Sequence, residues 1–315
     1  MKVFDSQTIQ STGAFLQGEL ERLDPQLYEP IADFTWSRDM PLREDVTIAD
    51  EVTSFVLSNY AGGFGGMGSG KSFLLGGSTT LATTSVSATK VVSPVTPWGM
   101  EVSYNIFELE KAQKAGRPID VQKFDALKLK HQLDIDMMVY LGDDQVGVKG
   151  LLNAEGTVEK ASLGSYDANS ATQEQTLDFF NGLLNAAWKQ TQYTRIPNTL
   201  LVTPSLFGAL ASKQLTNTSM NLLQFVKQNN IAAQNGIQLD IRPVKWLANG
   251  AVSSGQGRVV AYTMARDVVR FPLVQLQSMP VQFRGLEQAV PYYGALGAVE
   301  FVRPEMVMYA DYTAS

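Results

Sequence analysis

Residues 65–72 have the spacing of a phosphate-binding loop. The segment runs GGMGSGKS, so Lys71 and Ser72 stand where a phosphate-binding lysine and a magnesium-binding hydroxyl are required. Such a loop must also open a helix, because helix N-terminal N–H groups bind the phosphate. Residues 73–80 contain paired glycines and β-branched residues, which disfavour a helix. A P-loop nucleotide-binding protein using Gly65 to Ser72 is therefore an alternative hypothesis and not the leading one.

Few other residues could do chemistry. The chain has no cysteine and one histidine, His131, which excludes thiolate nucleophiles and histidine-rich metal sites. His131 lies between lysines in a predicted helix and is interpreted as a solvated or interface residue. Asp134, Asp136, Asp143 and Asp144 could bind magnesium, but acidic residues are common at helix ends and in the following turns. The sequence predicts no catalytic residue, no metal ligand and no cofactor.

The composition indicates a protein that is covered by other chains. Of the 315 residues, 44% are hydrophobic and only 18% are charged, whereas about 25% charged is typical. A surface that neutral needs contact with other chains to stay in solution. The net charge of −6, without a cluster of Lys and Arg, argues against binding to nucleic acid or to an anionic membrane. Neither a secretory signal nor an apolar run near 18 residues is present, so we expect a soluble cytosolic chain.

Residues 52–100 are the most unusual part of the sequence. Their only charged side chains are two lysines, and glycine, serine and threonine crowd residues 62–87. β-Branched runs at residues 52–56 and 83–95 predict the two strands of a long hairpin with a glycine-rich tip. Because a two-stranded hairpin is marginal alone in water, we expect a neighbouring subunit to cover its apolar residues. The candidates for this contact are Phe55, Leu57, Phe64, Lys71, Phe73 and Leu74.

Two segments flank this hairpin. Apolar residues at helical spacing predict an amphipathic helix over residues 6–23, followed by an extended piece in which Phe34 and Trp36 are further contact candidates. Residues 103–141 are predicted as one long helix, interrupted at residues 116–118 and ended by Gly142.

Residues 143–274 have the pattern of a globular α/β block. A capping box at Thr172 and Gln175 opens a helix predicted over residues 173–190. Further helices are predicted over residues 204–210 and 220–228, and strands over residues 199–203, 239–244, 258–263, 281–283, 297–302 and 305–309.

This order of elements resembles the tailed-bacteriophage major capsid protein of the Hong Kong 97 type. The resemblance spans nearly the whole chain and includes the segments WSRDMP from residue 36, LLVTP from residue 200, PYYGA from residue 291 and VEFVRP from residue 299. It implies an α+β, Hong Kong 97-like fold. Residues 1–45 would be an N-terminal arm, 46–100 an extended loop, 101–142 and 275–315 a peripheral domain with a spine helix, and 143–274 an α/β axial domain.

The same resemblance implies a function. The chain would self-assemble through hexamers and pentamers into the icosahedral shell around the double-stranded DNA of a tailed phage, without enzymatic activity. Only about 45 residues precede the hairpin, too few for the long scaffold segment of some members of the family, so a separate scaffolding protein is expected beside a portal and a decoration protein. The protein would be made in the bacterial host cytoplasm and reside in the virion. A bacterial nanocompartment shell of the same fold is a further alternative.

Overall fold

The computed structural model describes residues 33–62, 84–108, 110, 119–164, 166–167, 170–215, 220–248 and 256–313. The chain divides into two units, residues 1–33 and residues 34–315, and the fold described below belongs to the second. The helix predicted over residues 6–23 lies outside the described residues. The contact candidates Phe64, Lys71, Phe73 and Leu74 and the loop at residues 65–72 lie outside them as well.

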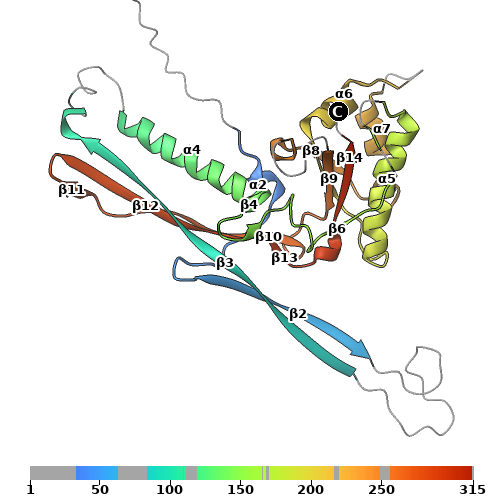
Figure 1. The fold of residues 1–315 in the computed structure, drawn as a ribbon, viewed down its shortest axis with the longest axis horizontal. Helices are drawn as coiled ribbons and strands as arrows, with labels where there is room; N and C mark the ends of the chain where they lie inside the picture. Colours follow the sequence, from blue (N-terminus) through green and yellow to red (C-terminus); the bar gives the residue numbers. More distant parts are fainter. Residues whose placement is uncertain are drawn as a thin grey trace, which may run out of the picture. The chain divides into compact units, whose positions relative to one another are not determined.

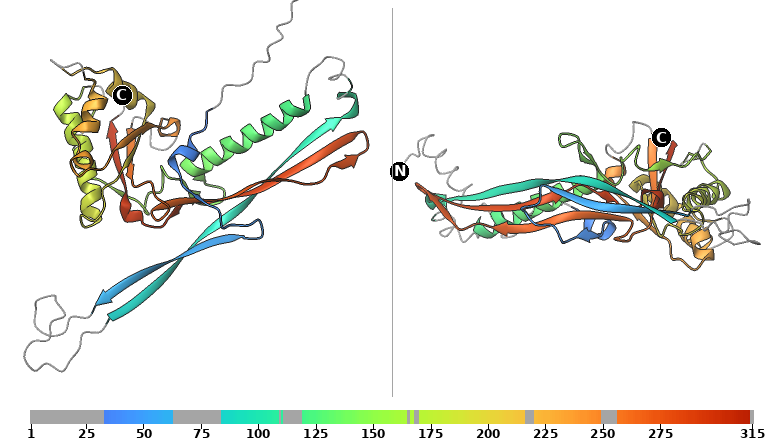
Figure 2. Two further views of the ribbon diagram at one scale, coloured as in Figure 1. Left: turned by 180° about the vertical axis from the view of Figure 1, so that it is seen from behind. Right: turned by 90° about the horizontal axis from the view of Figure 1, so that it is seen from below.

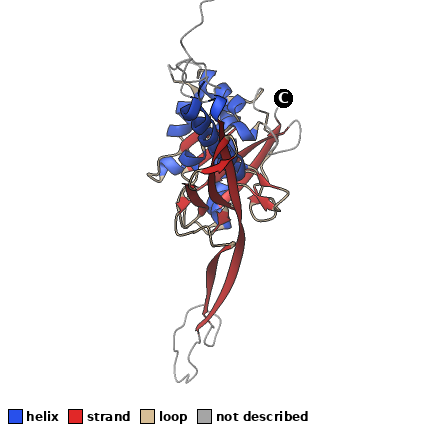
Figure 3. Ribbon diagram, turned by 90° about the vertical axis from the view of Figure 1, so that its left-hand side faces the viewer, coloured by secondary structure: helices blue, strands red, loops and turns tan. Residues whose placement is uncertain are grey.

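The predicted hairpin is confirmed. Its antiparallel strands are β2 (Val52–Gly62) and β3 (Thr84–Asn105), which pair from Val52 with Pro94 to Gly62 with Thr84 (Figure 1). The second half of β3 pairs instead with β12 (Glu287–Gly297). One 22-residue strand therefore joins the hairpin to the main sheet. No described helix lies beside the paired stretch of β2 and β3 (Figure 3).

This main sheet has seven strands in the order β1, β10, β12, β3, β2, with β11 paired to β12 and β13 paired to β10. The remaining bounds are β1 Leu42–Arg43, β10 Val269–Ser278, β11 Gln282–Arg284 and β13 Glu300–Phe301. The sequence analysis missed β10 and β12, and the strand that it predicted over residues 297–302 is reduced to β13. Both missed strands contain proline, which lacks a ladder N–H and normally argues against a central strand.

The prediction of a long helix over residues 103–141 is confirmed in part. Helix α4 (Ile119–Tyr140) confirms its second piece, and Gly142 ends it with a φ of +73°, a conformation that favours glycine. The prediction for residues 103–105 is wrong, because they pair with β12 as the end of β3. The interruption expected at residues 116–118 lies outside the described residues. Figure 2 shows α4 running alongside β3 and β12.

The α/β block forms around a second sheet of five strands in the order β6, β14, β9, β7, β8. Its strands are β6 Glu159–Lys160, β7 Thr199–Val202, β8 Asp240–Pro243, β9 Gln256–Tyr262 and β14 Val307–Thr313. Its helices are α5 Gln173–Gln190, α6 Pro204–Ser212, α7 Leu222–Gln228 and α8 Ile231–Gln234. The predicted capping box is confirmed: Gln175 N–H donates to the Thr172 hydroxyl, and Thr172 N–H to the Gln175 side chain. Short elements complete the fold: α2 Trp36–Asp39, β4 Gly142–Asp143, β5 Val148–Lys149, and two 3-10 turns, η1 Lys245–Leu247 and η2 Pro304–Met306.

The five-stranded sheet is buried on both faces. Along β9, Val260 and Tyr262 belong to a core shared with α4, α2 and β10, whereas Val259 and Ala261 belong to a core shared with α5, α6 and α7. This alternation follows from the two-residue period of a strand. No described helix is both long and apolar enough to span a membrane.

Strand pairing corrects the expected division of the chain at two points. Strand β14 pairs with β9, so the last described strand belongs to the α/β block and not to the strand-rich half in which residues 275–315 were placed. Conversely, β10 belongs to the seven-stranded sheet although it begins at Val269, before the expected boundary at residue 275. A chain end returning to an earlier sheet leaves no local signal in the sequence.

Candidate functional site

The base of the hairpin is held by a buried carboxylate. Glu300 on β13 is 1% exposed and accepts hydrogen bonds from Arg43 Nη1 at 2.9 Å and Arg270 Nε at 2.6 Å. Arg43 also donates to the carbonyl of Ser54 on β2 at 3.4 Å, and the Arg270 guanidinium lies 5.6 Å from the centre of the Phe55 ring. These contacts fix the first residues of β2 to β10 and β13.

Beyond this base the described hairpin residues are not covered by their own chain. Val56 on β2 is 59% exposed, and Val86 and Val92 on β3 are 61% and 56% exposed. All the residues from 85 to 90 are exposed. Of the contact candidates, Phe55 and Leu57 are half-buried at the start of the hairpin. The described part of the hairpin therefore carries exposed apolar side chains, and the contact of the individual candidate residues with another subunit stays a prediction.

A second apolar surface lies at the opposite end of β3, where β3 meets β11 and β12. We call it the distal patch. It comprises the exposed side chains of Ile106, Phe107, Met279, Val281, Phe283 and Leu286. Phe283 is 73% exposed, and the N–H of Ile106 donates to the carbonyl of Leu286 at 3.1 Å, which joins the two segments. The sequence analysis predicted a strand at residues 281–283. It did not predict that the apolar side chains of this strand are exposed.

The two N-terminal contact candidates differ in exposure. Trp36 on α2 is 6% exposed, packs in its own chain's core and donates from Nε1 to Gln132 at 2.9 Å. Phe34 is 38% exposed. Contact of either ring with another subunit stays a prediction, and Phe34 has the larger surface for it.

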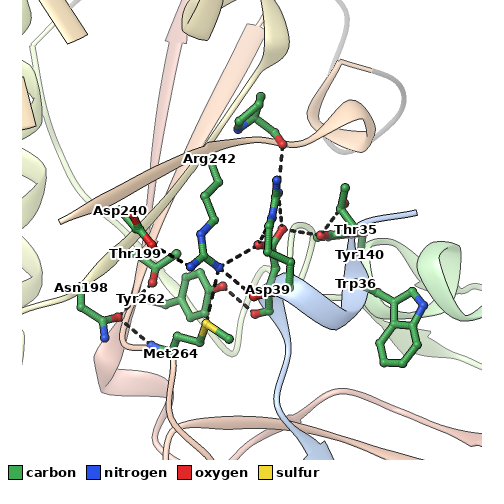
Figure 4. Close-up of polar contacts among 12 residues, drawn as sticks. Thr35, Trp36, Asp39, Tyr140, Asn198, Thr199, Asp240, Arg242, Tyr262 and Met264 are labelled. Carbon is green, nitrogen blue, oxygen red and sulfur yellow. Dashed lines mark hydrogen bonds and ion pairs between the residues drawn. The ribbon is translucent and has the colours of Figure 1, made fainter. Parts of the chain in front are cut away.

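A buried aspartate joins this N-terminal segment to the rest of the fold (Figure 4). The Asp39 carboxylate is fully buried and accepts hydrogen bonds from Arg38 at 2.8 Å, Arg242 at 3.1 Å and the Tyr140 hydroxyl at 2.5 Å. Its backbone carbonyl accepts from the Tyr262 hydroxyl at 2.6 Å. Burial, and next the Asp39 charge, raise the pKa of Tyr140, which keeps this phenol a donor. Side chains of α2, α4, β8 and β9 therefore meet at one aspartate, and we call this site the Asp39 junction.

The aspartates considered for magnesium binding have other roles. Asp136 accepts hydrogen bonds from the backbone N–H groups of α2 at 2.8 and 3.0 Å and from Trp246 Nε1 at 2.6 Å. Asp134 accepts from a tryptophan of β3 at 3.0 Å. The Asp143 carboxylate accepts a hydrogen bond from the backbone N–H of Gln145. Asp144 forms an ion pair with Lys149 at 2.6 Å. Within the described ranges no three acidic or histidine side chains are grouped so that they could hold a metal ion.

His131 was predicted to be either solvated or at an interface; the solvated alternative is wrong, and contact with another subunit stays a prediction. The His131 side chain is 5% exposed, and its ring packs edge-on against Trp98 with the ring centres 4.6 Å apart. Its Nε2 atom is buried without a hydrogen-bond partner. Burial lowers the pKa of His131, against a smaller opposing effect of Asp134. The imidazole is therefore neutral where α4 packs on β3.

Because the folded-state pKa of His131 lies below its unfolded value of about 6.5, its contribution to stability is present above that pH and is lost as pH falls. We expect the free energy of unfolding to decrease below about pH 6.5, by at most about 1.4 kcal/mol per pH unit. Urea unfolding between pH 7.5 and 5 measures this slope, and the His131→Gln variant is the control. Equal slopes in the two proteins would show that His131 is not responsible.

Many solved structures have a similar fold, and three of them are described here. The capsid of Myoviridae phage XM1 matches with a TM-score of 0.77 at 16% identity, covering 94% of this chain and 97% of that chain. A Mycobacterium phage Ogopogo structure matches with a TM-score of 0.56 at 13% identity, covering 100% of both chains. The virus-like particle from Pyrococcus furiosus matches with a TM-score of 0.51 at 14% identity, covering 87% and 91%.

The sequence itself carries a second finding. No curated protein matches the chain. A family model described as major capsid protein, however, matches residues 70–313, which include the five-stranded sheet, α4, and the seven-stranded sheet apart from β1 and β2. A match over most of the chain is sufficient to assign the family, and the resemblance drawn from the order of the elements is thereby confirmed: the chain belongs to the major capsid protein family.

Proposed function

We propose that this protein is the subunit of an icosahedral shell, built through hexamers and pentamers, that encloses the double-stranded DNA of a tailed phage. The observation that carries the proposal is the hairpin of β2 and β3, whose exposed valines have no cover from their own chain among the described residues. Such a hairpin is stable only when another surface buries it. In a protein of the major capsid family, that surface belongs to another copy.

The two apolar surfaces support a closed shell because they lie far apart. The hairpin occupies one end of β3 and the distal patch the other, and 22 residues of strand at about 3.3 Å each span about 70 Å. The two surfaces are therefore too far apart on one subunit to form one continuous contact area. Two distinct contacts per subunit are what a shell needs, one to close rings and another to join the rings.

The alternatives have less support. The family consists of structural proteins. A nucleotide site also needs a strand that leads to a magnesium-binding aspartate, and the apolar residues 138–140 before Asp143, which could suggest such a strand, lie in helix α4 instead. The phosphate-loop segment itself lies outside the described residues. The nanocompartment alternative rests on a fold that both kinds of shell share. The net charge of −6 suits a wall that does not trap its packaged DNA.

Finer assignments belong to the same proposal. Residues 46–100 would act as the extended loop, residues 101–142 and β10 to β13 as the peripheral domain, and residues 143–268 with β14 as the axial domain. A separate scaffolding protein, a portal and a decoration protein would be the partners. Synthesis would take place in the bacterial host cytoplasm, and the mature protein would reside in the virion.

Removing the distal patch tests the proposal. We expect a chain carrying Phe283→Ser and Leu286→Ser to fold and to form rings, but not to close into shells, because these two side chains are 73% and 56% exposed and contribute little to the subunit's own core. Electron microscopy of the purified protein, co-expressed with the other phage structural proteins, measures shell formation. Val146→Ser, a change of another exposed apolar side chain, is the matched control.

A double variant that closes shells as readily as the unchanged chain would show that the distal patch is not a contact between rings. Three outcomes would contradict the shell function itself. The first is an unchanged chain that stays monomeric at every concentration even with its phage partners. The second is specific ATP binding that Lys71→Ala abolishes, which would favour the nucleotide-binding alternative. The third is particles that hold protein cargo and no DNA, which would favour the nanocompartment.

A further inference from the structure

An apolar groove of about 880 Å³ lies between α4 and strands β10 and β12. Leu273, Leu276 and Tyr292 line it from the strands, Phe124 from α4, and Phe34 from the segment before α2. Side chains from three parts of the chain thus surround it. Small-molecule sites in proteins are mostly apolar and have volumes of about 300–1,000 Å³. The groove therefore has the size and the character of a site for a small apolar ligand.

One cation lies at this groove. Lys128 on α4 is the only charged residue among the described lining residues. Its ammonium lies over the Phe124 ring, 4.3 Å from the ring centre, and no carboxylate of the described residues pairs with it. The nearby Lys130, in contrast, pairs with Asp134. A ligand with a carboxylate would complement the Lys128 charge and accept a charge-assisted hydrogen bond from it.

His131 is the second polar feature of the groove. It is a lining residue that follows Lys128 by three positions on α4, and residues at this spacing lie on the same face of a helix. Its side chain is 5% exposed, and its Nε2 atom is buried without a hydrogen-bond partner. A buried polar atom without a partner costs free energy, so a ligand that supplies the hydrogen bond gains that free energy on binding. A carboxylate oxygen supplies it when the ring carries its proton on Nε2.

We propose that this groove binds an amphiphilic monocarboxylate, that is, a fatty acid or a compound of the same chemistry. The carboxylate pairs with the Lys128 ammonium and accepts a hydrogen bond from His131, and the hydrocarbon tail lies against Phe34, Leu276 and Tyr292. Lys128 repels a cationic amphiphile, and an alcohol of the same length lacks the ion pair, so the groove selects its ligand by charge. The inference goes beyond the proposed function and uses none of the contacts between copies.

Competition for the groove tests the proposal. A fluorescent fatty acid is bound to the purified protein and displaced by decanoate, decanol or decyltrimethylammonium, each below its micelle concentration. We expect decanoate to displace the fluorescent fatty acid best. Lys128→Met keeps an apolar stem and removes the charge, so it should weaken decanoate binding about tenfold and leave decanol binding unchanged. Lys128→Glu should reverse the order and favour the ammonium compound.

Lys130→Met is the matched control. Lys130 is an exposed lysine of the same helix and does not line the groove. We expect this variant to bind decanoate as the unchanged protein does. Equal losses in Lys128→Met and Lys130→Met would reveal only a general attraction of anions to the helix and would overturn the proposal. Equal binding of the three competitors by the unchanged protein would overturn it as well.

His131 provides a second measurement, because it is the only histidine of the chain. Solid-state NMR of protein made with isotopically labelled histidine therefore observes one imidazole. We expect decanoate to shift the Nε2 resonance, and Lys128→Glu to remove that shift at the same decanoate concentration. An unchanged resonance at saturating decanoate would contradict the placement of the carboxylate. Shells that form from a protein unable to bind decanoate would overturn the groove site and leave the proposed function intact.

Discussion

A chain in which residues 63–83 are replaced by a two-residue Asn-Gly turn is expected to fold normally and to lose shell assembly altogether. Gly62 pairs directly with Thr84, which is the register that a two-residue turn connects, so the shortened hairpin keeps its ladder. The described residues of the two larger cores all lie outside the hairpin of β2 and β3 up to Val92. Loss of the tip should therefore leave the unfolding transition unchanged while removing a contact that every ring repeats.

Sedimentation and electron microscopy measure assembly in this experiment, and urea unfolding measures stability. Lys71→Ala in the full-length hairpin is the control, because it removes the one charge of the tip and keeps its apolar residues. We expect that control to assemble. An unfolded shortened chain would mean that the tip belongs to its own subunit's core, and shells formed from the shortened chain would mean that the tip is not a contact.

Local patterns in the sequence predicted the elements whose stability is local. The capping box at Thr172 fixed the start of α5, and the β-branched runs beside the glycine-rich tip predicted β2 and the first half of β3. Gly142 ended α4 as expected because its positive φ disfavours other residues. These signals lie within a few residues of the structure that they determine.

Long-range pairing was not predictable in the same way. The end of β3 was taken for helix, although residues 103–105 are held in the sheet by β12, nearly two hundred residues further on. His131 was taken as solvated because its neighbours in the sequence are lysines, whereas Trp98 on another element buries it. The exposure of a strand is equally hard to predict from its own sequence. Nothing within residues 279–286 indicates that the apolar side chains of the distal patch are exposed.

The Asp39 junction shows the same limit most clearly, because its partners are distant in the sequence. Asp39 is separated from Tyr140 by 101 positions and from Arg242 by 203. The sequence analysis used the segment from residue 36 only as part of a family resemblance. The structure explains its chemistry: one buried carboxylate neutralises two arginines and orients a phenol where α2, α4 and the five-stranded sheet meet.

Asp39→Asn is therefore expected to be among the most destabilising single changes in the chain. The amide is nearly the same size as the carboxylate, but it leaves Arg38 without a counter-charge and Arg242 with Asp240 alone, at a site where Asp39 is 0% exposed. Breaking a buried ion pair by removing one partner costs about 3–5 kcal/mol. An arginine guanidinium keeps its proton at neutral pH, so Arg38 cannot escape the cost by becoming neutral.

Asp45→Asn provides the matched comparison. Asp45 also pairs with an arginine, Arg43, at 2.7 Å, but its side chain is 66% exposed and solvent screens the pair. We expect this change to cost less than about 1 kcal/mol. Urea unfolding at neutral pH measures both variants. If Asp39→Asn cost no more than Asp45→Asn, the junction would not hold the N-terminal segment to α4 and the five-stranded sheet, and α2 would have to be positioned by the packing of Trp36 and by the hydrogen bonds to Asp136.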